Sequence, residues 1–277
     1  MLLEFQKNEI TEYVVYTKLA KMNPENSEIL LKIASDELNH YHRIKEKTGK
    51  DVKPNFLKVY FYITLAKILG LTFSLKLMER NEDRTQAAYS TSNDELLKEL
   101  VEDEKEHEES LLELLSEEKL DYIGSMVLGL NDALVELTGA LAGLTFAIQK
   151  TSIVALSGII TGIAAALSMS ASDYLARKSE GGERNPFRSA LYTGIAYIIT
   201  VIILTFPYLI FGNPFAALAL TIVNAVLIIS VFTFFVSVVK DQDFKRNFLE
   251  MFLISMGVAV ASFFIGVFVK QFFNVEI

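Results

Sequence analysis

The chain carries two hydrophobic patterns, and one replaces the other near residue 121. Over residues 1–120, apolar side chains recur every three to four positions among charged ones, which is the pattern of amphipathic helices. Over residues 121–277, the apolar runs are long enough for a bilayer core about 30 Å thick, which needs roughly 20 helical residues. The pattern therefore predicts an all-α chain, with a soluble domain at residues 1–120 and a transmembrane domain at residues 121–277.

Proline, glycine and capping residues divide the first domain into four predicted helices. The breaks fall at Pro24, at the 49–54 stretch and at the cap region 91–94. We expect helices over residues 2–22, 25–48, 56–90 and 93–118. Four amphipathic helices of this length predict a four-helix bundle.

The second domain contains five candidate spans, which must be helices because unpaired backbone groups are too costly in hydrocarbon. They lie at residues 123–148, 153–174, 190–211, 215–239 and 248–269. Basic residues gather in the loops that follow the second and fourth spans, whereas the opposite loops offer only Lys150. The positive-inside rule then places these basic loops and the N-terminal domain in the cytoplasm, and the C-terminus on the opposite side.

The distribution of charge and the absence of cysteine limit the kinds of crosslink and metal site that the chain can form. Residues 1–121 hold 17 Lys+Arg against 25 Asp+Glu, while residues 122–277 hold 9 of each, so the net charge of −8 belongs to the first domain. The absence of cysteine excludes disulfides, thiolate zinc sites and iron–sulfur clusters. We see no apolar leader typical of a cleavable signal peptide. We expect lipid, metal ions and protons as partners, and no nucleic acid.

Two Glu-x-x-His frames use two of the three histidines. Glu37 precedes His40 in the second predicted helix, and Glu104 precedes His107 in the fourth, so each pair shares a helix face. A di-iron carboxylate bundle needs such a pair on two helices and a glutamate from each of the others. The predicted metal ligands are therefore Glu9, Glu37, His40, Glu79, Glu82, Glu104 and His107, with Glu12 as a further ligand one turn from Glu9. Oxygen and imidazole ligands suit iron or manganese.

The spans contain a few ionisable groups. Asp132 and Glu136 share a face of the first span, where a charge costs at least about 2.5 kcal/mol and should have a task or a partner. Met169 and Asp173 repeat the four-residue spacing near the end of the second span. All four are predicted to line a path for a divalent cation. The alternatives are a structural hydrogen-bonded pair in the first span, packing for Met169, and a helix-end salt bridge for Asp173.

The region 56–78 is mostly apolar yet carries Lys58, Lys67 and Lys76. Each lysine would be expensive in lipid, so these residues are not predicted to form a span. Two interpretations remain open: the helix packs against a partner subunit, or it rests on the bilayer surface.

These motifs carry a resemblance to two families. The first 120 residues resemble a rubrerythrin-type ferritin-like domain. The remainder is similar to the vacuolar iron transporter family, through residues 129–135 (GLNDALV), and through residues 166–169 (ALSM) with 173–175 (DYL). Ala133 stands where that family usually has glycine, Asp173 where glutamate is commoner, and the loop at Gly181 replaces a helical metal-binding insert.

The resemblance implies a homodimer with the ion path between its subunits, and export of Fe(II) from the cytoplasm in exchange for protons, with Mn(II) as the alternative ion. It also implies that the ferritin-like domain captures or senses iron in place of the missing insert. We predict no catalytic residue for this transporter. The alternative hypothesis is a membrane-anchored ferroxidase or peroxide-reducing enzyme, in which the spans serve mainly as an anchor.

Overall fold

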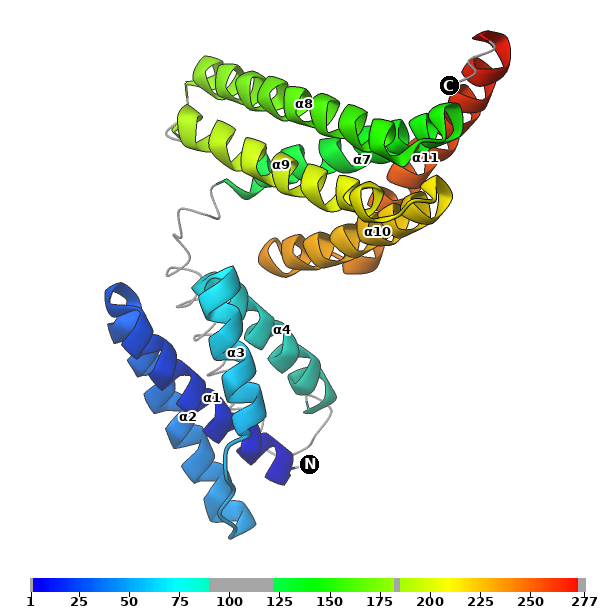
Figure 1. Ribbon diagram of the computed structural model, residues 1–277. Helices are drawn as coiled ribbons and strands as arrows, with labels where there is room; N and C mark the ends of the chain where they lie inside the picture. Colours follow the sequence, from blue (N-terminus) through cyan, green and yellow to red (C-terminus); the bar gives the residue numbers. More distant parts are fainter. Residues whose placement is uncertain (1, 90–121, 182–184, 274–277) are drawn as a thin grey trace. The chain divides into compact units, whose positions relative to one another are not determined.

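The computed structural model describes residues 2–89, 122–181 and 185–273. Within these ranges every regular element is a helix, as the hydrophobic pattern predicts (Figure 1). The chain divides into two compact units, Met1–Glu117 and Glu118–Ile277. Each unit is described on its own.

The first unit begins with a helical hairpin. Helices α1 (Leu2–Met22) and α2 (Ser27–Thr48) pack along each other and are joined by the single turn η1 (Pro24–Asn26). Gly49 ends α2 in the left-handed conformation at φ 62°, which glycine adopts without strain. The predicted helices 2–22 and 25–48 are confirmed apart from the short turn between them. The predicted helix 93–118 lies outside the described residues.

The predicted helix 56–90 is in fact two helices, α3 (Phe56–Leu69) and α4 (Leu71–Tyr89). Gly70 breaks the helix at φ 99° and ψ 160°, a conformation open almost only to glycine. The Ser74 hydroxyl donates to the Tyr62 carbonyl at 2.9 Å, and the Asn81 amide donates to the Tyr62 hydroxyl at 3.0 Å. These bonds show that α4 folds back along α3, as Figure 1 shows.

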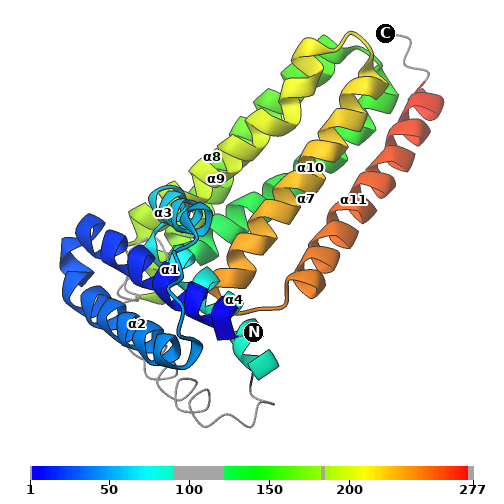
Figure 2. The same ribbon diagram turned by 90° about the horizontal axis from the view of Figure 1, so that it is seen from below.

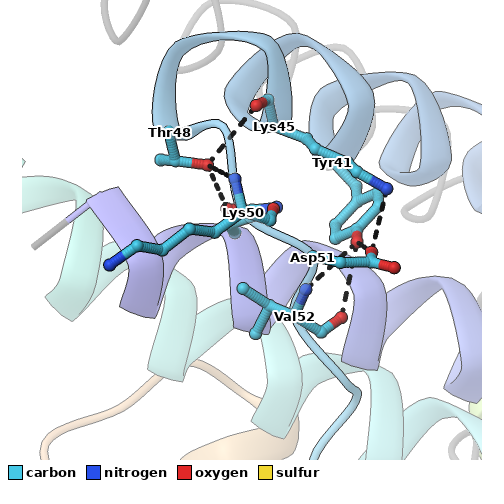
Figure 3. A network of polar contacts seen from close by, with 7 residues as sticks. Tyr41, Lys45, Thr48, Lys50, Asp51 and Val52 are labelled. Carbon is cyan, nitrogen blue, oxygen red and sulfur yellow. Dashed lines mark hydrogen bonds and ion pairs between the residues drawn. The ribbon is translucent and has the colours of Figure 1, made fainter.

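Figure 3 shows the segment between α2 and α3, which side chains hold in place. The Tyr41 hydroxyl donates to the Asp51 carboxylate, and the Lys45 ammonium lies 2.9 Å from the same oxygen. The Tyr41 hydroxyl above all, and then Lys45, holds the pKa of Asp51 below its usual value. From α1, the Gln6 amide donates to the Lys50 carbonyl at 2.8 Å. These contacts fix where α3 begins against the hairpin.

The described residues of the second unit contain five helices long and apolar enough to cross a membrane, which confirms the five predicted spans. They are α7 (Ile123–Ile148), α8 (Thr151–Glu180), α9 (Pro186–Ile210), α10 (Pro214–Val239) and α11 (Phe244–Phe273). Asn185 and Asn213 cap α9 and α10: each side chain accepts two backbone N–H bonds, and a proline follows it. The protein is therefore an integral membrane protein.

Helix α7 is central to this unit, since it packs against each of the other four helices. Figures 1 and 2 show α8 and α9 side by side over most of their length. Glycines permit the closest approaches: Gly129 meets the backbone of Thr193 on α9, and Gly143 and Gly266 bring α7 and α11 together backbone to backbone. A side chain larger than hydrogen would force these helices apart.

Helix α9 contains Pro207, whose missing N–H leaves the carbonyl of Ile203 without its helical donor. The neighbouring helix supplies a replacement, because the Asn224 side-chain amide donates to that carbonyl at 3.1 Å. Close by, the Thr221 hydroxyl donates to the Leu204 carbonyl at 2.9 Å. The Asn224 side chain of α10 thus compensates the backbone carbonyl that the proline leaves without a donor.

Candidate functional site

Three predicted metal ligands of the first unit meet inside the α1–α2 hairpin. Glu9 comes from α1, and Glu37 and His40 come from one face of α2, with 2%, 1% and 3% of their surfaces exposed. One ligand atom from each lies within 4.8 Å of the other two. Nδ1 of His40 is 3.3 Å from Glu9 and 3.8 Å from Glu37. The Glu-x-x-His spacing and the facing glutamate therefore converge as the sequence pattern predicts.

This triad has the donor chemistry of a transition-metal site. Two carboxylates buried side by side repel each other, and removing a charge from water is costly unless it is paired. Glu9, Glu37 and His40 could hold a divalent cation, which would offset both carboxylate charges and accept the imidazole nitrogen as a third ligand. Carboxylate oxygen with imidazole nitrogen suits Fe(II) and Mn(II). The residues present therefore fit a metal ion of this class.

The other predicted ligands are only partly described. Glu79 lies on α4 with one carboxylate oxygen, Oε1, buried. Glu12 is half-buried on α1. The side chain of Glu82 lies outside the described residues, as do Glu104 and His107. His42, which belongs to neither Glu-x-x-His frame, is exposed on α2 with its ring against Tyr41.

In the membrane unit, Asp132 and Glu136 occupy one face of α7. Asp132 is half-buried, and its carboxylate makes no hydrogen bond or ion pair with another described residue. Glu136 is exposed, and one of its oxygens accepts a hydrogen bond from the Tyr197 hydroxyl at 2.8 Å. The two acids therefore lie in the apolar part of the chain with little of their hydrogen-bonding capacity used.

Two cavities approach this turn of α7 from opposite ends. The first, of about 300 Å³, lies among α7, α10 and α11 and reaches Asn131; its polar lining includes Lys240, Gln242, Asn247 and Glu250. The second, of about 460 Å³, begins at Glu136 and Tyr197 and continues along Gly139, Gly143 and Gly266 toward the other end of α7 and α11. Asp132 lines neither cavity: it follows Asn131 of the first in sequence, and it lies one helical turn before Glu136 of the second.

Asp173 has a different environment, with 3% of its surface exposed. Its carboxylate accepts hydrogen bonds from Ser189 at 2.6 Å and Thr193 at 3.1 Å, both on α9. Nε of Arg177, one turn along α8, lies 3.4 Å away. Ser189 also bonds Ser125 of α7 at 2.6 Å, so the cluster ties three helices together. Met169, one turn before Asp173, is half-buried and packs against the apolar core.

Helix α9 supplies partners that sequence reasoning missed. Ser189, Thr193 and Tyr197 are four residues apart, so their hydroxyls form one stripe that faces the acids of α7 and α8. The spacing is visible in the sequence. Hydroxyl residues are common in spans, however, and their periodicity gains meaning only once an acid is known to lie opposite.

Part of the membrane unit also matches a known family. Residues 123–182 match the VIT family. This match covers α7 and α8, together with both motifs that carry the resemblance to vacuolar iron transporters. With five helices able to span a bilayer, it indicates a membrane transporter of metal ions. No curated protein matches the chain.

Proposed function

We propose that this chain exports Fe(II) from the cytoplasm in exchange for protons, with Mn(II) as the alternative ion. The observation that carries the proposal is the Asp132–Glu136 turn of α7. Asn131, just before this turn, lines one cavity, and Glu136, at its end, lines a second cavity that extends toward the other end of α7. An ion that enters past Asn131 meets Asp132 first and Glu136 one turn later. The predicted orientation makes the cavity beside Lys240 the cytoplasmic one.

Proton exchange has a physical basis in the free hydrogen-bonding capacity of these acids. A carboxylate in a poorly hydrated site favours neutralisation, and either a proton or a metal cation can provide it. Asp132 has no fixed cationic partner among the described residues, so the two ligands compete for the same oxygens. Alternate occupation by metal and proton constitutes antiport.

We further propose that a second copy completes the path. Glu136 is exposed on a helix inside the membrane, where a charged side chain facing lipid is costly. The second cavity, which Glu136 lines, is edged by small residues, including Gly139, Ala140 and Gly143, so that a helix of a second copy can approach closely and close its open side. Because the chain has no cysteine, Ala140→Cys gives a single crosslinking site. We expect disulfide-linked dimers in membranes, and Leu209→Cys on the exposed face of α9 serves as the control.

For the first unit we propose a ferritin-like di-iron domain that captures or senses iron. The buried triad of Glu9, Glu37 and His40 supports this role. Glu37→Ala should remove bound iron from the purified full-length protein while basal flux persists, whereas Glu46→Ala, on the exposed side of the same helix, should change neither. Full iron content in the Glu37 variant would remove the triad from the proposal.

The transport proposal is tested in proteoliposomes with Fe(II) and Mn(II) supplied side by side and a pH-sensitive dye trapped inside. We expect metal uptake accompanied by proton movement in the opposite direction. Metal flux without proton movement would eliminate the exchange, and no flux of either ion would eliminate the transporter.

The triad also favours a second candidate function, because buried carboxylate and imidazole ligands serve oxidase sites as well as capture sites. A membrane-anchored ferroxidase would consume oxygen with Fe(II) over many turnovers and lose this activity in Glu37→Ala. Oxidation to Fe(III) conflicts with a path for the divalent ion, so we place this function second.

A further inference from the structure

Helix α3 exposes an unusually apolar surface. Leu57, Phe61 and Ile68 have 84%, 52% and 70% of their surfaces exposed, and Tyr60 beside them is also exposed. On the inner face, Val59 and Tyr62 are buried against the rest of the unit. A helix that is apolar on both faces normally has both faces covered. The outer face of α3 therefore needs an occupant.

The outer residues form a stripe at helical spacing. Leu57, Phe61 and Ile68 are four and seven residues apart, which places them on one line along the helix. Lys58 and Lys67 fall on the two opposite flanks of this line, and both are exposed. The stripe is thus apolar in the middle and cationic along each side.

The charge of α3 is opposite to that of its surroundings. The helix contains two lysines and no acidic residue, although residues 1–121 carry the whole net charge of −8. A third cation lies beside the stripe, because Nζ of Lys18 on α1 is 4.9 Å from the centre of the Tyr60 ring. Lysines that flank an aromatic and aliphatic stripe are typical of helices in the membrane interface. There the ammonium groups reach the lipid phosphates while the apolar side chains enter the acyl region.

We infer that α3 lies on the bilayer surface, with Leu57, Phe61 and Ile68 inserted into the headgroup and acyl boundary and with Lys58 and Lys67 bound to anionic lipid phosphates. Two observations favour lipid over a second protein surface. The cations flank the stripe on both sides, which matches a continuous plane of phosphates. The same chain carries five membrane-spanning helices, so a bilayer is always within reach of this unit. Such contact limits the orientations that the first unit can take at the membrane.

The test uses the absence of tryptophan from the chain. Phe61→Trp gives the full-length protein one fluorophore in the stripe, and its emission is measured in nanodiscs made with brominated or ordinary phosphatidylglycerol. We expect brominated lipid to quench at least half of the emission. Phe206→Trp on the exposed face of α9 is the control for full quenching, and Leu31→Trp on the exposed face of α2 is the control for none.

The charge requirement is tested on the same fluorophore. Adding Lys58→Gln and Lys67→Gln should reduce the quenching at least twofold, and so should the replacement of phosphatidylglycerol by phosphatidylcholine. Unquenched emission from Phe61→Trp would overturn the inference. If that unquenched emission is also blue-shifted, and the blue shift disappears when each nanodisc holds a single chain, the occupant is a second copy of the chain. Quenching that ignores both lysines and lipid charge would overturn the phosphate contacts.

Discussion

Two carboxylates of the same transmembrane bundle have opposite environments. Asp173 is enclosed by two hydroxyls of α9 and by Arg177, and it is almost inaccessible. Asp132 on α7 is half-buried without a hydrogen-bond partner among the described residues, and two cavities are lined by Asn131 just before it and by Glu136 one turn after it. A charged side chain inside a membrane protein can thus be stabilised in two ways. Fixed side chains can pair with it, which makes it structural, or protons and metal ions can reach it along a path.

This difference indicates separate roles for the Asp132–Glu136 pair and for Asp173, although both belong to motifs with the same four-residue spacing. The geometry of Asp173 favours the helix-end interaction with Arg177, together with a hydrogen-bonded junction of α7, α8 and α9. Asp132 and Glu136 keep free oxygens for a cation. We therefore propose that transport depends on the α7 pair, and that Asp173 maintains the helix arrangement around it.

The largest expected effect follows from Asp132→Asn. The variant keeps the size of the side chain but loses the charge that offsets the metal ion, and losing one partner of a desolvated charge pair costs about 3 kcal/mol or more, roughly 100-fold in flux. Thermal unfolding in detergent should stay near that of the original protein, because the carboxylate bonds no described residue. Flux comparable to the original would show that the free acid is not part of the path.

The converse result is expected from Asp173→Ala. This change removes the acceptor that the hydroxyls of Ser189 and Thr193 share, although both keep their contacts to Ser125, and it takes the buried partner from Arg177. Stability should therefore fall by about 1–3 kcal/mol. Flux per folded molecule should persist. Glu180→Ala is the matched control, since Glu180 bonds the same arginine at 3.1 Å but is exposed and should matter little. If Asp173→Ala folds as stably as the original and stops transport, Asp132 and Asp173 do not differ as proposed.

A smaller effect is expected where the fixed partner serves a backbone carbonyl and not a charged side chain, as Asn224 does for Ile203. Asn224→Ala should cost about 1 kcal/mol, because the carbonyl of Ile203 then has no donor. In the Pro207→Ala background the restored backbone N–H can bond this carbonyl, so the same substitution should cost less. Unfolding in a double-mutant cycle measures the difference. Equal costs in both backgrounds would mean that Asn224 does not compensate the proline.

The sequence predicts the spans well and the soluble helices less completely, for a physical reason. A bilayer demands one unbroken apolar helix per crossing, so the run of residues 123–148 alone defines α7. In water, a single glycine within a helical pattern is usually tolerated, and nothing local marks Gly70 as the place where α3 ends. Its backbone conformation is favoured only once α4 packs back on α3 through Tyr62.

The candidate site residues could also be predicted only where local sequence carries the information. Glu9, Glu37 and His40 could be predicted because helix periodicity fixes which residues of one helix share a face. Asp132 and Glu136 stand out because a charge in an apolar run is rare. The partners of Asp173 could not be predicted, since Ser189 and Thr193 reach it only through the packing of α9 against α8. Spacing within a helix is local information, and the pairing of faces between helices is not.

The smallest effect is expected at Asp51, a carboxylate of the first unit that is exposed to water. Asp51 has fixed partners like those of Asp173, but it is exposed, so the Tyr41 hydroxyl and Lys45 ammonium compete with solvent. Its pKa is lowered from the usual 3.8, so the stabilisation is fully present above that pH and is lost as the pH falls through the lowered value. Hydrogen exchange of the Val52 amide, which donates to Tyr41, should show this loss after correction for intrinsic rates.

The control for this pH dependence is Asp51→Asn, which removes the titrating group and keeps its shape. Its Val52 amide should exchange faster than in the original protein at neutral pH, and its protection should not change further on acidification. Melting of the membrane helices should be unaffected in both cases, because the segment near Asp51 belongs to the other compact unit. Equal acid sensitivity in Asp51→Asn would assign the titration to another group. The exposed partners of Asp51 would then contribute nothing measurable to stability, in contrast to the buried partners of Asp173, which join three helices.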